Sequence, residues 1–146
     1  MQAIYPFILI IHLFCAIIFL GYLFFDVVIF PNIKRIFGEE VSSKASKAIS
    51  ARGVKIMPLC VLGLLITGGM MLSNYINTNS GWFDTNLQKL LLIKVFLALV
   101  IILMVAISLT YAFILKKPSP VRKIIHPVAI VLGFFIVILA KLMFFV

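Results

Sequence analysis

Four long apolar runs constrain the fold of this chain more than any other feature. They span residues 4–30, 55–74, 88–115 and 124–145, and each is long enough to cross a hydrocarbon core ~30 Å thick at ~1.5 Å per helical residue. The chain is 64% hydrophobic, and a soluble domain of 146 residues has no way to bury so much apolar surface. We therefore predict an all-α, integral membrane four-helix bundle in which residues 1–146 form a single domain.

Positive charge is concentrated in two of the connecting segments. The loop at 74–88 has no Lys or Arg, whereas the segments 31–54 and 116–123 are basic, and loops rich in Lys and Arg stay on the cytoplasmic side. We therefore predict that loop 31–54 is cytoplasmic and that the N- and C-termini lie on the periplasmic side of a bacterial inner membrane. The formal charge of +9 then faces the anionic inner leaflet, not nucleic acid. Within the segment 31–54, residues 39–53 have helical spacing and are expected to lie along the membrane surface. The basic residues are Lys34, Arg35, Lys44, Lys47, Arg52 and Lys55, then Lys116, Lys117, Arg122 and Lys123.

Ionisable residues interrupt three of the apolar runs. They are His12, Asp26, Lys94 and His126, and an ionisable group at membrane depth is costly enough to be a functional-site hypothesis. His12 lies ~12 Å and Lys94 ~9 Å from the outer ends of their helices, so these two residues fall at one level. Asp26 and His126 fall near the inner ends of theirs, with Met57 nearby. The sequence thus predicts an outer and an inner polar tier.

Most of these residues also have a purely structural interpretation. Lys94 is able to extend its amine to the outer interface, and His126 precedes a proline where a helix begins. Asp26 has Arg35 and Lys55 within reach of an ion pair. These alternatives stay open at the level of sequence.

His12 is the residue that a structural interpretation explains least well. An imidazole in the middle of an apolar run needs a polar partner, so we predict a ligand or proton-handling role for it. The other histidine, His126, lies more than ~12 Å away along the membrane normal. One metal ion, or one haem with two histidine ligands, is therefore not expected to bind both.

Polar and small residues share a face with His12 and recur on matching faces of the next two runs. At ~100° per residue these faces are predicted to point into the bundle. Their members are Ile8, His12, Cys15, Phe19 and Asp26; Met57, Cys60, Leu64, Thr67 and Met71; and Lys94, Ala98, Ile101, Val105, Ser108 and Ala112.

Soft ligands on the first two faces raise a copper hypothesis. Cu(I) prefers thiolate and thioether ligands together with imidazole. The candidate ligands are His12, Cys15, Met57 and Cys60, followed by Met70 and Met71. They stand singly or as one pair, not in CxxC or MxxM clusters, and a buried hydrophobe is the ordinary role of such cysteines.

The residues around His12 and Lys94 resemble those of the CopD-like and HemJ-like family of small bacterial membrane proteins. The first run reads His12-Leu-Phe-Cys-Ala-Ile-Ile-Phe-Leu-Gly21 and leaves the membrane at Phe30-Pro31, and the third contains Leu91-Leu92-Ile93-Lys94. Phe19 stands where this family often has Trp, and the stretch from Asp26 to Pro31 is closer to the CopD-like form.

The resemblance implies a four-helix membrane fold and two functions. The HemJ-like branch implies that His12 and Lys94 bind haem b and that the protein oxidises protoporphyrinogen, with Lys94 as second ligand or propionate partner. The CopD-like branch implies copper transport or resistance. A third hypothesis is a cofactor-free assembly subunit in which polar residues fix helix register. Gly68-Gly69 and the small residues of the third run also leave room for a homodimer.

Overall fold

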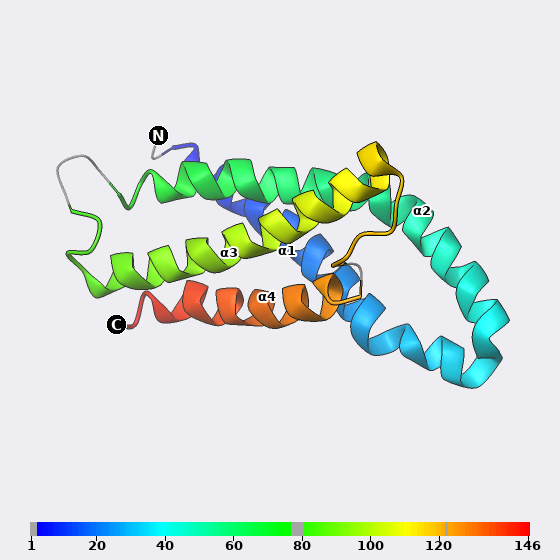
Figure 1. Cartoon of the computed structure of the whole chain (residues 1–146). Helices are drawn as coiled ribbons and strands as arrows, with labels where there is room; N and C mark the ends of the chain where they lie inside the picture. Colours follow the sequence, from blue (N-terminus) through cyan, green and yellow to red (C-terminus); the bar gives the residue numbers. More distant parts are fainter. Residues whose placement is uncertain (1–2, 77–80, 122) are drawn as a thin grey trace. The chain divides into compact units, whose positions relative to one another are not determined.

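The computed structural model describes residues 3–76, 81–121 and 123–146, and within them every regular element is a helix (Figure 1). Four helices are long and apolar enough to cross a membrane: Tyr5–Ile29, Pro31–Leu72, Asn86–Leu115 and Ile125–Leu142. The predicted all-α class and the four spans are thereby confirmed. Arg122 and part of the predicted outer loop, 77–80, lie outside the described residues.

The helices divide into two compact units, Met1–Met71 and Leu72–Val146. The first unit contains α1, η1 and nearly all of α2, and the second contains α3, η2 and α4. The arrangement of the two units as one bundle, and the side of the membrane on which the termini lie, remain predictions.

The first span ends in a wider helical turn. α1 covers Tyr5–Phe24, with a proline in its first turn where a missing N–H costs nothing. It continues into the π-helical turn η1, Phe25–Ile29, where the N–H of Phe30 donates to the carbonyl of Phe25 at 2.8 Å. Asp26 therefore lies in a widened turn, an irregularity that is frequent at functional sites.

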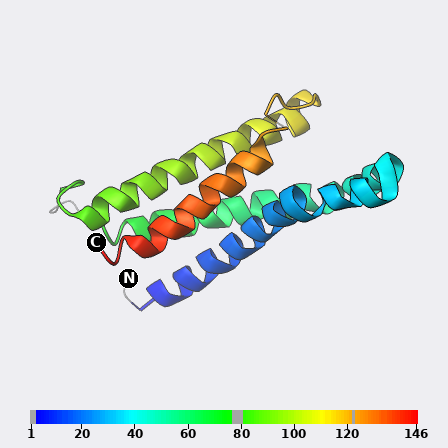
Figure 2. The ribbon, with the colours of Figure 1, turned by 90° about the horizontal axis from the view of Figure 1, so that it is seen from below.

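The segment 31–54, predicted as a cytoplasmic loop with helical spacing over 39–53, is helical and forms the first part of α2, Pro31–Leu72 (Figure 2). Proline at the first helical position favours this start. Gly38 is the one residue of α2 with non-helical angles, and its φ of 86° is a conformation that residues with a Cβ rarely adopt. The chain therefore changes direction at Gly38, before the polar stretch and not after it.

From residue 39 onward α2 continues into the membrane span without a further break. These 34 residues extend ~51 Å at ~1.5 Å per residue, well beyond a hydrocarbon core of ~30 Å. The helical spacing predicted for 39–53 is confirmed, and α2 bends between this polar part and its apolar part (Figure 1). The expectation that 39–53 lies along the membrane surface stays a prediction. Pro58 lies inside α2, where a proline removes a helical hydrogen bond and bends a helix.

The second unit is an antiparallel helix pair. α3 covers Asn86–Thr110, and its first turn is capped reciprocally by Thr85 and Gln88, as expected for a capping box. α3 continues through the π-helical turn η2, Tyr111–Leu115, and stops where Lys116 adopts the left-handed conformation. α4 covers Ile125–Leu142 and packs along α3. These bounds agree closely with the predicted third and fourth runs.

Candidate functional site

Within the first unit, α1 lies against the second half of α2 in antiparallel orientation. Three close approaches define the register: His12 lies beside Thr67 and Gly68, Cys15 beside Gly63, and Tyr22 beside Gly53. Partner numbers fall along α2 as they rise along α1. The face predicted to carry His12 and Cys15 therefore does meet the face predicted to carry Thr67.

His12 takes part in a short chain of hydrogen bonds that ends on the backbone of α2. Its Nδ1 lies 2.8 Å from Oγ1 of Thr67, and this hydroxyl donates to the carbonyl oxygen of Gly63 at 2.6 Å. A hydroxyl has only one hydrogen to donate. Because Thr67 gives its hydrogen to Gly63, Nδ1 of His12 is the donor to Thr67, and the neutral ring carries its lone pair on Nε2.

This chain of hydrogen bonds is partly buried. Thr67 is only 6% exposed, and His12 is half-buried. A Cβ on Gly68 would lie 3.4 Å from Cε1 of His12, an ordinary van der Waals contact, so the ring lies directly beside α2 at this position. The sequence pattern placed Thr67 on the correct face, but neither Thr67 nor Gly63 was predicted as a partner of His12.

The two cysteines approach each other one turn further into the unit. A Cβ on Gly63 would lie only 2.8 Å from Sγ of Cys15, and Cys60 lies three residues before Gly63 on the same side of α2. The thiols of Cys15 and Cys60 are near enough to interact electrostatically. Cys60 is buried, Cys15 is half-buried, and neither is in a disulfide.

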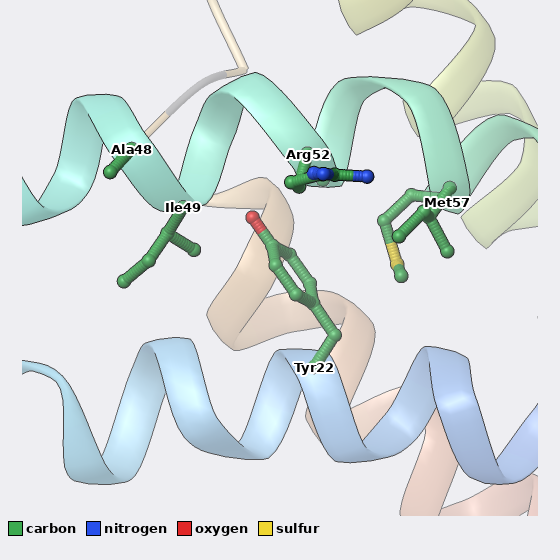
Figure 3. Close-up of a pocket in the computed structure, with 7 residues that line it drawn as sticks. Tyr22, Ala48, Ile49, Arg52 and Met57 are labelled. Carbon is green, nitrogen blue, oxygen red and sulfur yellow. The ribbon is translucent and has the colours of Figure 1, made fainter.

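Towards the polar end of α2, Tyr22 takes the place that a side chain at Gly53 would occupy. The hydroxyl oxygen of Tyr22 would lie 2.7 Å from a Cβ on Gly53. Figure 3 shows the ring rising from α1 towards α2, with Ile49 and Met57 on either side of it. Asp26 is near enough to Tyr22 to act on it electrostatically. Tyr22 was not predicted, because a tyrosine near a membrane interface is ordinary.

The predicted site residues are divided between the two units. His12, Cys15, Asp26, Met57 and Cys60 lie in the first unit. The second unit contains Lys94, half-buried in α3, and His126, half-buried in the first turn of α4. The predicted pairing of His12 with Lys94 and of Asp26 with His126 therefore stays a prediction. Among residues 3–76, 81–121 and 123–146, no three His, Cys, Asp or Glu side chains group as a metal site.

No protein-family model, curated protein or solved structure matches this chain. The resemblance to CopD-like and HemJ-like proteins accordingly rests on the residues quoted above and stays a prediction.

Proposed function

We propose that this protein is a membrane redox protein that binds haem b through Nε2 of His12. The observation that carries the proposal is the chain of hydrogen bonds from His12 through Thr67 to the carbonyl of Gly63. A histidine that binds a metal through one ring nitrogen usually donates its other N–H to an oxygen, which fixes the tautomer and orients the ring. His12 has this arrangement before any ligand is considered.

The surroundings of His12 fit haem better than a bare metal ion. A haem brings four nitrogen ligands of its own and asks the protein for one or two axial ligands, so a single well-oriented imidazole suffices. A bare Zn²⁺ ion asks for three or four protein ligands, and among the described residues no three His, Cys, Asp or Glu side chains gather as such a group. When bound, haem b would supply one-electron exchange at a potential set by its axial ligand and by burial.

The residues around His12 have separable roles in this proposal. His12 supplies the ligand nitrogen, Thr67 holds the ring in one tautomer, and the Gly63 carbonyl fixes the Thr67 hydroxyl. Because this carbonyl belongs to the helix backbone, ring orientation is tied to the register of α1 against α2. Donation from Nδ1 to an oxygen also raises the basicity of Nε2 and so strengthens the bond to iron.

The substrate and the setting of this proposal come from the resemblance and from the distribution of charge. We assign the protein to a bacterial inner membrane with both termini on the periplasmic side, since the basic residues cluster in the polar first part of α2 and in the segment between the last two spans. Protoporphyrinogen oxidation is the reaction proposed, and Lys94 is the second haem residue proposed. A homodimer fits the same proposal, with small residues of the spans at its interface.

The Thr67 hydroxyl provides the sharpest test of the His12 geometry. We expect Thr67→Val to weaken haem binding by about 10- to 100-fold and to raise the midpoint potential, because Nδ1 loses its acceptor and Nε2 becomes less basic. Thr67→Ser keeps the hydroxyl and should retain both values near those of the unmodified protein. Haem titration and a potentiometric titration in detergent measure the two quantities. Equal effects of Val and Ser would show that the hydroxyl does not orient the ligand.

The proximity of Cys15 and Cys60 favours copper handling as a second candidate. Two thiols near enough to interact electrostatically, with Met57 one turn from Cys60 on α2, offer the soft ligands that Cu(I) prefers. We expect the double variant Cys15→Ser, Cys60→Ser to lose Cu(I) retained after removal of free metal, with His126→Ala as the control. Unchanged copper content would remove this candidate. A protein that takes up neither haem nor copper would be left with the assembly role.

A further inference from the structure

A groove separate from the His12 site lies where α1 meets the polar end of the α2 span. It is a shallow, open depression of about 420 Å³, bordered by Tyr22 of α1 and by side chains of α2 between 48 and 57 (Figure 3). Four of the α2 side chains are apolar, and the fifth is an arginine. They are Ala48, Ile49, Ile56 and Met57, with Arg52 among them.

The position of the groove along α2 is that of a membrane interface. The apolar part of α2 runs from about residue 54 to Leu72, ~28 Å at ~1.5 Å per residue, which matches a hydrocarbon core. Ile56 and Met57 thus fall at the edge of the hydrocarbon, and Ala48, Ile49 and Arg52 fall at the level of the headgroups. Tyr22 suits this level, because its ring is apolar and its hydroxyl polar.

The charge of α2 around the groove is positive. In residues 41–72, α2 has four basic residues and no Asp or Glu. Among the described residues of this unit, the ion pairs are Lys34 with Glu39 and Lys44 with Glu40, so Arg52 is in neither. Asp26 acts on Tyr22 electrostatically but does not line the groove. The lining is therefore almost wholly apolar, with the guanidinium of Arg52 at its border and no carboxylate among the lining residues.

We infer that this groove binds one anionic phospholipid of the surrounding leaflet, with its phosphodiester on Arg52 and an acyl chain along Ile56 and Met57. A guanidinium is able to donate two parallel hydrogen bonds to a phosphate, and basic pockets between membrane helices take anionic headgroups in this way. Because Ile56 and Met57 form an apolar lining, we expect the groove to prefer a lipid, which has an acyl chain, over a free anion. The inference is independent of whether His12 binds haem.

Native mass spectrometry of the full-length protein in detergent tests this inference. The protein is titrated with dioleoyl phosphatidylglycerol or with dioleoyl phosphatidylcholine, and the fraction carrying one lipid is measured. We expect phosphatidylglycerol to bind preferentially, and Arg52→Gln to reduce its binding about fivefold while leaving phosphatidylcholine unchanged. Lys47→Gln is the matched control, since it removes the same charge from the same helix at an exposed position that does not line the groove.

A second variant tests the shape of the groove and leaves its charge intact. Ala48→Trp places a large ring in the groove from an exposed position, so we expect normal helicity and a loss of phosphatidylglycerol binding comparable to that of Arg52→Gln. Equal losses in Lys47→Gln and Arg52→Gln would overturn the proposal in favour of diffuse attraction. Displacement of the lipid by inorganic phosphate at matched concentration would also overturn it, because the groove would then recognise phosphate alone.

Discussion

Replacing His12 by alanine should abolish haem binding. The proposed ligand nitrogen is lost, and no other histidine lies in the first unit to replace it. We expect the reduced-minus-oxidised spectrum of the detergent-purified variant to lack the Soret, alpha and beta bands, and the ratio of haem to protein to fall close to zero. Absorption spectroscopy after haem is supplied makes the measurement, and circular dichroism confirms that the variant keeps its helices.

His126→Ala is the matched control for this experiment. It removes the other imidazole of the chain, which lies half-buried in the first turn of α4, in the second unit. We expect its spectrum to match that of the unmodified protein. Loss of haem in both variants, or in neither, would contradict the assignment of His12 as the ligand. A colourless unmodified protein would contradict haem binding itself.

Sequence reasoning located His12 because composition makes an imidazole in an apolar run conspicuous. The same reasoning grouped Cys15, Cys60 and Thr67 on faces that do meet, since helical periodicity alone decides which residues share a face. Periodicity does not give the register of one helix against another. The hydrogen bond between His12 and Thr67 depends on that register and could therefore not be predicted from the sequence.

The segment 31–54 shows a second limit of the same kind. The sequence has helical spacing over 39–53, but the polarity of the whole segment predicts a loop, whereas the helix begins at Pro31, a residue suited to a helix start. Polarity reports that a segment leaves the hydrocarbon, not that its backbone stops being helical. The interruption of the helix is at Gly38, which has a positive φ. The sequence alone does not show which φ a glycine adopts, so this position was not predicted.

Glycine also sets how closely α1 approaches α2, and this gives the second large expected effect. Gly63 faces Cys15 so closely that a Cβ would lie 2.8 Å from Sγ, whereas a Cβ on Gly69 would meet nothing within 4 Å. We expect Gly63→Val to force the helices apart and to lower the free energy of unfolding by about 1–3 kcal/mol, as overpacking of an interior does. Gly69→Val should change stability far less.

Two measurements separate overpacking from a general effect of valine in a helix. Loss of helical circular dichroism in an SDS titration reports stability, and maleimide labelling of Cys60 reports separation of α1 from α2, because this thiol is buried. Cys15→Ala removes the sulfur that meets residue 63 and should restore part of the stability lost in Gly63→Val, leaving Cys60 as the only labelled thiol. Similar losses for Gly63→Val and Gly69→Val, with no recovery in the double variant, would mean that α1 does not pack on α2 in this register. In that case His12 would not meet Thr67, the residue that orients its ring. The Gly63 experiment therefore also tests the proposed ligand geometry, because both depend on the same register of α1 against α2.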